Sequence, residues 1–274
     1  MHGRVRTGAA AAGAALVALG AAAAPASAKI SALPSFDSQF RKGATKLAKA
    51  IADNPKQVIR GSFTLLPPGG RPVAISSTKL ADFPRHGKTY GILSSGDARL
   101  AGRPNKRGDL GRGNGGPFVR GARDVTIFRI DLRVPKNSCL SFSFRFLTEE
   151  FPEFVGTEFN DGFIAEVGSS SWNATSNDDP TIIAPGDFAL DPNNHLISVN
   201  GAGPATVDAS SAKGTTYDGA TGVLRASTPV KRGRRSLYLS IFDQGDRQYD
   251  SSVFVDHLRL RKSSNCTPGV VSDA

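Results

Sequence analysis

Strict alternation of apolar and polar residues is the feature that most limits what this chain can fold into. From Asp124 onward, several runs place an apolar side chain at every second position. They are Phe128, Ile130, Leu132 and Val134; Leu140, Phe142, Phe144 and Phe146; Leu237, Leu239 and Ile241; and Phe254, Leu258 and Leu260. A period of two with one apolar face is typical of antiparallel strands that pack against a second sheet. The pattern predicts a mainly β protein, an antiparallel β-sandwich of jelly-roll type.

The N-terminal part of the chain is the place where a helix is expected. Between about residues 36 and 53, Phe36, Phe40, Leu47 and Ile51 fall near one face, and Asp53-Asn54-Pro55 then ends the helix. A short amphipathic helix of this kind is expected to cover a sheet. Short strands are predicted at 63–66 and 90–93, and the Gly- and Arg-rich stretch at about 95–118 is interpreted as a long loop.

The first 28 residues have the pattern of a secretory signal peptide. Arg4 and Arg6 precede an apolar, Ala-rich stretch, and Ala26-Ser27-Ala28 forms a cleavage site. A retained membrane anchor is the alternative, but Pro25 interrupts the apolar run. No later window reaches the roughly 18 apolar residues of a spanning helix. The sequence therefore predicts a signal peptide at 1–28, one secreted extracellular domain at 29–274, and no membrane span.

The charge of the mature chain is basic. Removing Arg4 and Arg6 leaves 32 Lys and Arg against 24 acids, a formal charge of +8. The excess is densest at 231–235 and 259–262, with a looser group at 99–112. No nucleic-acid-binding motif accompanies these groups, so no specific nucleic acid is expected. A solvated basic surface is the simplest interpretation, and attraction to an acidic glycan or an anionic cell wall is the alternative.

Two cysteines, Cys139 and Cys266, form an even and small set in a chain predicted to be exported. This set favours one disulfide, which would attach the start of one strand to the tail after the last. Two free thiols are the alternative, and a metal site is less favoured because no matching His or Cys spacing accompanies the pair.

Two acidic segments, 147–163 and 242–256, follow strong strands and mix carboxylates with Gly and Asn. Such loops supply the oxygen ligands that Ca²⁺ prefers. The candidate ligands are Glu149, Glu150, Asp161, Asp243, Asp246, Asp250 and Asp256, although not all seven can bind one ion. Asp256 shares a face with Phe254 by alternation and should therefore be buried, where it must be paired, hydrogen-bonded or metal-bound. Turn caps are the alternative for Asp161 and Asp250.

The same two segments resemble the choice-of-anchor L domain family. The resemblance is carried by residues 142–156 with Phe159-Asn160-Asp161, and by residues 242–256. It extends upstream to Gly91 to Gly96, and between the two segments to Tyr217-Asp218-Gly219-Ala220-Thr221. It implies an exported, β-rich bacterial module of the kind that is attached to the cell surface by differing C-terminal devices. Only eight residues follow Cys266, without a sorting motif. We therefore expect free secretion, or retention on the cell wall by charge.

Two classes of function remain open. A glycan-active hydrolase could use Glu149, Glu150, Glu153 and Glu158 as paired carboxylates. Against this, a sugar-binding cleft is usually lined by Trp and Tyr, but Trp172 is the single Trp, and His257 is expected to be a surface residue rather than a base. The favoured hypothesis is a non-enzymatic, calcium-stabilised module for adhesion or for cell-envelope or glycan binding. Its partners would be a cell-wall polymer, a glycan or another surface protein.

Overall fold

The computed structural model describes residues 30–33, 38–105, 114–175, 181–262 and 265–273; the predicted signal peptide lies outside them. The elements are β1 (Ile30–Ala32), α1 (Ser38–Ala50), η1 (Pro55–Gln57), β2 (Val58–Leu65), β3 (Val73–Ser76), β4 (Tyr90–Ser94), η2 (Ala98–Leu100), β5 (Arg123–Val134), β6 (Ser138–Thr148), β7 (Gly162–Val167), β8 (Asn173–Ala174), β9 (Ile182–Ile183), β10 (Ile197–Ser198), η3 (Gly203–Ala205), β11 (Gly219–Ala220), β12 (Leu224–Val230), β13 (Gly233–Asp243), β14 (Ser251–Arg261) and β15 (Gly269–Ser272). In this part of the chain, no helix has the length and apolarity to cross a bilayer.

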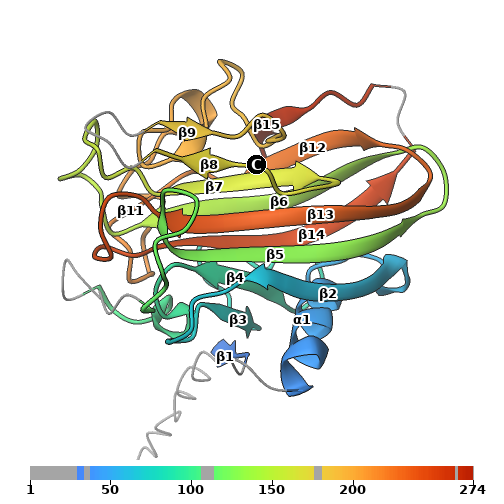
Figure 1. Ribbon diagram of the computed structural model, residues 1–274, viewed down its shortest axis with the longest axis horizontal. Helices are drawn as coiled ribbons and strands as arrows, with labels where there is room; N and C mark the ends of the chain where they lie inside the picture. The colour runs from blue at the N-terminus through green and yellow to red at the C-terminus, as the bar shows by residue number, and fades with distance from the viewer. Residues whose placement is uncertain (1–29, 34–37, 106–113, 176–180, 263–264, 274) are drawn as a thin grey trace, which may run out of the picture.

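The long strands form two antiparallel sheets that face each other (Figure 1). One sheet has the order β1-β3-β4-β14-β6-β12-β15, with β11 also paired to β6, and the other has the order β10-β7-β13-β5-β2. Successive long strands cross from one sheet to the other, so β4-β14-β6-β12 faces β5-β13-β7-β10. This order is that of a jelly roll. The predicted mainly β, sandwich-like fold is confirmed.

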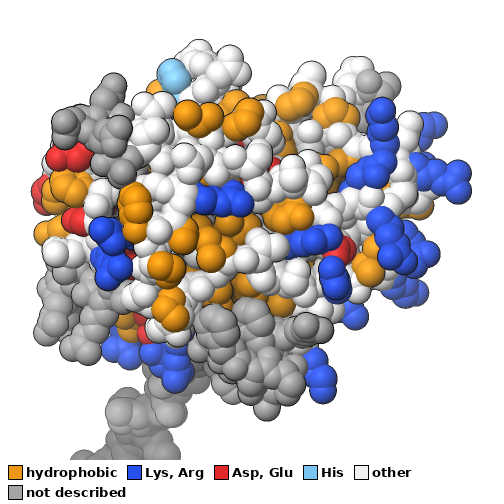
Figure 2. Space-filling view, in the orientation of Figure 1, with side chains coloured by type: hydrophobic (Ala, Val, Ile, Leu, Met, Phe, Trp, Pro, Cys, Tyr) orange, Lys and Arg blue, Asp and Glu red, His pale blue; other side chains and the backbone are white. Residues whose placement is uncertain are grey.

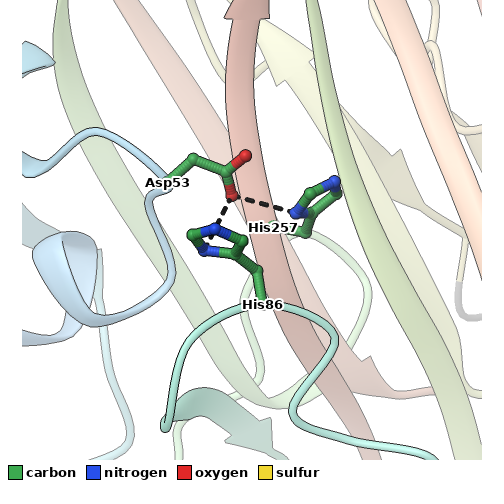
Figure 3. A group of neighbouring side chains, drawn as sticks. All are labelled: Asp53, His86 and His257. Atoms are coloured by element: carbon green, nitrogen blue, oxygen red, sulfur yellow. Dashed lines mark ion pairs between the residues drawn. The ribbon is translucent and has the colours of Figure 1, made fainter.

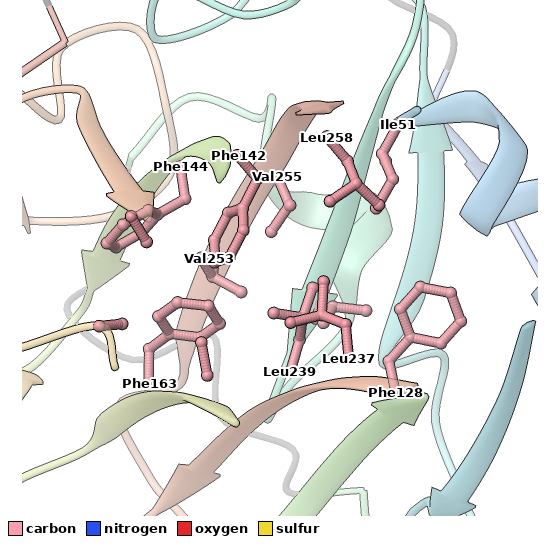
Figure 4. Packing of buried hydrophobic residues seen from close by; sticks show 14 of the residues in the cluster. Ile51, Phe128, Phe142, Phe144, Phe163, Leu237, Leu239, Val253, Val255 and Leu258 are labelled. Atoms are coloured by element: carbon pink, nitrogen blue, oxygen red, sulfur yellow. The ribbon is translucent and has the colours of Figure 1, made fainter. Parts of the chain in front are cut away.

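The core lies between the two sheets and is built largely from the alternating positions (Figure 4). Phe128, Ile130, Leu132 and Val134 of β5 face Phe142, Phe144 and Phe146 of β6, all at most 2% exposed, and the β13 residues Leu237, Leu239 and Ile241 join them. The aromatic rings interlock: Phe163 lies 5.0 Å from Phe144 between ring centroids, and 6.3 Å from Phe142 with the rings perpendicular. The faces of β5, β6 and β13 were therefore correctly predicted.

Helix α1 packs against β2 and β4, which belong to different sheets, and so covers one side of the sandwich. Leu47 and Ile51 are buried in the core, as predicted for the apolar face; the side chains of Phe36 and Phe40 lie outside the described residues. Close approach of the helix depends on Gly61 in β2, because a Cβ there would lie 2.2 Å from the carbonyl oxygen of Ala44. The helix therefore covers the sheets, as expected.

The alternation in β14 is interrupted, and here the prediction was wrong. Phe254 packs with Phe83 and Tyr90 on the outer face of its sheet, whereas Leu258 lies in the core between the sheets. The pairing of β14 with β6 shifts register between Asp256 and Arg259, and His257 has φ +57°. An inserted residue of this kind reverses the faces of all positions beyond it.

Loops cover the outer faces of both sheets, which explains why so few strand residues are exposed. Trp172 stacks on Phe242 with ring centroids 4.3 Å apart and donates from Nε1 to the hydroxyl of Ser240. The predicted disulfide is present: Cys139 and Cys266 are joined, with Cα atoms 5.5 Å apart. The loop expected at about 95–118 contains η2, and its residues 106–113 lie outside the described part.

Candidate functional site: a buried acidic cluster

The two acidic segments meet at one end of the sandwich. The segment 149–161 leaves the end of β6, and the segment 244–250 joins β13 to β14, so topology brings both loops to the same end (Figure 1). A hydrogen bond ties them together, since the backbone N–H of Glu149 donates to the carbonyl oxygen of Asp250 at 3.2 Å. Segments almost one hundred residues apart therefore form one structural unit.

Five of the seven predicted ligands, and one further acid, are buried at this end. We call this set the acidic cluster; its members are at most 4% exposed. They are Asp124, Glu149, Glu150, Asp161, Asp243 and Asp250. Asp124 was missed by the sequence analysis because it begins β5 next to Arg123 and looked like an ordinary strand terminus. Nothing in its local sequence indicates that the fold brings it near Asp243.

Backbone and side-chain contacts hold these carboxylates in place. Oδ1 of Asp161 accepts from the backbone N–H of Gln244 at 3.0 Å, and Oε2 of Glu150 accepts from the backbone N–H of Asp161 at 3.4 Å. Oδ1 of Asp124 accepts from the N–H of Gly116 at 2.6 Å. Gly96 lets the chain pass close to Asp250, because a Cβ at Gly96 would lie 2.0 Å from Oδ2 of that residue. The cluster is thus rigidly packed.

Several oxygens in this region are buried and receive no hydrogen bond from any described residue. They are Oδ2 of Asp161, Oδ2 of Asp124, both carboxylate oxygens of Asp243, Oε1 of Gln244 and Oδ1 of Asn114. The hydroxyl of Ser95 lies near enough to Asp243 to lower its pKa, and Ser251 and Asp243 lie near enough to Asp161 to lower its pKa, but none of these contacts to the oxygens named above has hydrogen-bond geometry. Buried acceptors without donors are rare in folded proteins and are costly. A bound cation is one way to satisfy them.

The electrostatics of the cluster are unfavourable without such a cation. Desolvation by burial, followed by the charge of Asp161, raises the pKa of Glu150 far above its usual range. Burial also raises the pKa of Asp161, and burial together with Asp161 and Asp250 raises that of Asp243. Burial away from water and nearby negative charges both favour the protonated form of a carboxyl group. Without a neutralising charge nearby, these buried acids are therefore largely protonated near neutral pH.

The remaining two predicted ligands, Asp246 and Asp256, are not part of the acidic cluster. Asp246 is half-buried and its Oδ1 caps its own turn by accepting from the N–H of Gln248 at 2.9 Å. Asp256 is buried as expected, but further along β14, where its carboxylate accepts backbone N–H groups from Arg85, His86 and His257 at 2.7 to 2.8 Å. These three bonds account for the burial of Asp256 without a metal.

The donor set consists of oxygen atoms alone, the ligand type that hard cations prefer. Ca²⁺ takes six to eight oxygens from carboxylates, amides and carbonyls, and the cluster and its neighbours Gln244 and Asn114 offer that chemistry. A glycosidase would need a sugar between two accessible carboxylates. Of the four candidate carboxylates, Glu149 and Glu150 are each only 1% exposed, whereas Glu153 and Glu158 are exposed. Trp172 is buried against Phe242 rather than presented for stacking on a sugar.

His257 was expected to be a surface residue rather than a base, and it is only partly exposed. Its side chain is 19% exposed and its Nδ1 lies 3.0 Å from Oδ1 of Asp53, because the irregularity in β14 turns it toward the loop that follows α1. No sequence signal links these two residues, which lie some two hundred positions apart in the chain.

Comparison with known protein families gives a match that spans both acidic segments. The family described as the choice-of-anchor L domain matches residues 88–258, which include both acidic segments and most of the two sheets, and this match indicates an exported surface or secreted module. A search of curated proteins found no match. Because the matched residues make up more than half of its length, the chain belongs to the choice-of-anchor L domain family.

Proposed function

We propose that this protein is a secreted, non-enzymatic module whose acidic cluster binds Ca²⁺, and that it serves adhesion or the binding of cell-envelope polymers and glycans. The observation that carries the calcium part is the convergence of six buried carboxylates whose unsatisfied oxygens include those of Asp243 and Asp161. A divalent cation there would neutralise charge that burial makes costly. It would also join the two acidic loops and the start of β5.

The loops over the cluster supply a contact surface. Phe154, Phe159 and Tyr249 form a half-buried aromatic group, with centroids 5.0 Å apart for Phe154 and Tyr249 and 5.2 Å for Phe154 and Phe159. Val155 beside them is 48% exposed. Loops on a rigid scaffold commonly carry ligand contacts. In this proposal calcium holds the aromatic group in place, and a glycan or another surface protein binds to it.

The opposite end of the sheets is basic. Figure 2 shows Lys and Arg side chains gathered at the right of the view, where the β5–β6 and β12–β13 hairpins lie. The exposed residues are Arg133, Lys136, Lys231, Arg232 and Arg234. Arg133 and Arg234 are direct cross-strand partners in β5 and β13. Like charges in such positions are destabilising. An anionic envelope polymer would relieve that repulsion, which supports retention by charge.

Calorimetric unfolding tests the calcium proposal. The mature protein is stripped of metal and titrated with Ca²⁺, and the unfolding midpoint should rise with concentration, by about 2.7 kcal/mol of stability at a hundredfold excess over Kd. Asp243→Asn should abolish the rise. The matched control is Glu158→Gln in the other acidic segment, because Glu158 is exposed and does not belong to the buried cluster.

A midpoint that does not respond to Ca²⁺ would refute the metal site, and the carboxylates would then be held by protons. A wild-type protein that cleaves glycans, with activity lost in Glu150→Gln, would instead support the hydrolase alternative.

A further inference from the structure

A second group of metal-ligating side chains lies far from the acidic cluster, on the opposite side of β14 from the core. Asp53 follows α1, His86 precedes β4, and His257 lies at the register shift of β14 (Figure 3). Oδ1 of Asp53 lies 3.3 Å from Nδ1 of His86 and 3.0 Å from Nδ1 of His257, and each of the three residues places one ligand atom within 4.8 Å of the other two. Three segments distant in sequence thus direct ligand atoms to one point.

The backbone around these three side chains is held in place by hydrogen bonds. The N–H of Asp53 donates to the carbonyl oxygen of Leu258 at 3.0 Å, and the N–H of Leu258 donates to that of Ile51 at 2.8 Å. Asp256 fixes the other two segments, because its carboxylate accepts from the N–H groups of His86 and His257. This arrangement accounts for the buried Asp256 and for the positive φ of His257, and it holds all three ligand atoms in place.

The contact between Asp53 and His257 does not have the geometry of a hydrogen bond. Oδ1 of Asp53 and Nδ1 of His257 are both buried, and neither has a hydrogen-bond partner among the described residues although they lie 3.0 Å apart. Ligands around a tetrahedral zinc ion, with bonds of about 2.0 to 2.1 Å, lie about 3.4 Å from one another. The observed separations of 3.0 and 3.3 Å are close to that value.

We propose that Asp53, His86 and His257 bind a divalent transition metal of the zinc class. Two imidazoles and one carboxylate suit Zn²⁺, Ni²⁺, Co²⁺ or Cu²⁺, whereas Ca²⁺ prefers oxygen ligands alone. The side chain of His86 is 50% exposed, so the ion is reached from solvent and keeps an open coordination position. The site differs from the acidic cluster in place and in ligand chemistry, and it does not depend on the calcium proposal.

Arg259 competes with the metal. Its Nη1 contacts Nε2 of His257, and its Nε donates to the hydroxyl of Ser141. A metal on Nδ1 leaves the proton of the neutral ring on Nε2, where it cannot face a guanidinium that only donates. Arg259 must therefore turn away when the metal binds. Removal of this side chain should tighten metal binding.

Titration calorimetry with ZnCl₂ tests the site, using the metal-stripped mature protein without a polyhistidine tag and with Ca²⁺ at saturation so that the acidic cluster is occupied. One Zn²⁺ per chain should bind. His86→Ala should weaken binding by at least about tenfold, the loss seen even for residues that only support a metal ligand. Because His86 is half-exposed, this variant should fold, which its unfolding midpoint without zinc checks.

His195→Ala is the matched control. His195 also has a half-exposed ring with Nδ1 close to an aspartate, 3.1 Å from Oδ2 of Asp191, and no second histidine belongs to that pair. Its loss should leave zinc affinity unchanged. Co²⁺ gives a further readout, because its visible absorption should indicate four-coordinate geometry in the wild type and should be lost in His257→Gln. Unchanged zinc affinity in His86→Ala, or equal losses in His86→Ala and His195→Ala, would overturn the proposal.

Arg259→Met should bind Zn²⁺ more tightly than the wild type. An affinity equal to or lower than that of the wild type would contradict the competing role of Arg259.

Discussion

Oδ1 of Asp161 accepts a hydrogen bond from the backbone N–H of Gln244 at 3.0 Å, although the two residues belong to different acidic loops. The bond holds one carboxylate oxygen of Asp161, whereas no contact of the buried Oδ2 has hydrogen-bond geometry, although Ser251 and Asp243 lie close enough to lower the pKa of this group. Asp161 therefore has both a structural contact and an unused oxygen directed into the cluster. This combination makes it the residue at which the metal-bound and metal-free states should differ most.

Asp243→Asn should have different effects in the two states. Asp243 has no exposed surface, and neither carboxylate oxygen has a hydrogen-bond partner among the described residues. Without metal, the variant should be at least as stable as the wild type near neutral pH, because the raised pKa of Asp243 requires the wild type to take up a proton on folding and the amide does not. With Ca²⁺, the variant should be less stable than the wild type. Denaturant unfolding with and without Ca²⁺ measures both values, and a variant that loses stability in both states would contradict the interpretation.

The metal-free protein should lose stability as pH rises from about 4 through neutral. Burial raises the pKa of Asp161 to about 8 and that of Glu150 to about 10. A carboxyl whose pKa is raised on folding binds more protons in the folded state than in the unfolded state above pH 4. The free energy of unfolding then falls with increasing pH. Urea unfolding at several pH values measures the slope.

Saturating Ca²⁺ should remove most of this slope, because a bound cation replaces the protons. A smaller slope should remain from Asp187, which lies outside the cluster and whose pKa burial raises to about 7. Stability that rises with pH in the metal-free protein would be inconsistent with the buried acids described above.

Removing the disulfide should destabilise the protein without altering the response to calcium. Cys139 and Cys266 lie 127 residues apart in sequence. The entropy model assigns about 5 kcal/mol to a crosslink over a loop of this length, and strain in the native state can lower that value. Cys139→Ser with Cys266→Ser should therefore lower the unfolding midpoint, and reduced wild-type protein is the matched comparison. Because Cys139 lies near the start of β6 and the acidic loop follows the other end of this strand, the increase in midpoint with Ca²⁺ should persist.

The basic end should bind an anionic polymer through charge. Replacing both Arg133 and Arg234 with Gln should weaken retention on a heparin or polyphosphate column and reduce its dependence on salt. The same change should raise stability by about 0.2 to 1 kcal/mol, because the two arginines are cross-strand partners. Lys42→Gln with Lys46→Gln on α1 removes the same charge elsewhere, from two exposed side chains. Equal retention of the two double variants would argue for net charge rather than this surface.

The alternating strands show which strand faces can be predicted from the order of apolar and polar residues. In β5, β6 and β13 the apolar positions predicted for one face all lie in the core, because a regular strand directs every second side chain to the same side. In β14 the same rule failed after Asp256, where the register shifts. A single inserted residue has no signature in the alternation itself, so Leu258 was assigned to the face of Phe254.

The acidic cluster, too, could be predicted from the sequence only in part. Five of its six carboxylates were predicted from their concentration in two loops, but Asp124 was not, since it comes near Asp243 only when β5 pairs with β13. The group formed by Asp53, His86 and His257 was not predicted at all, because each of its residues lies alone in the sequence.

The sequence by itself determined the fold class, the strands of the core, the disulfide and the acidic composition of two loops. These depend on local periodicity, on a count of cysteines and on the resemblance of contiguous segments. Only the tertiary structure decided which acids are buried together, how Asp256 is satisfied, and that two histidines meet one aspartate. Such groupings depend on strand order and on the register shift in β14, which long-range packing sets and which no local pattern encodes.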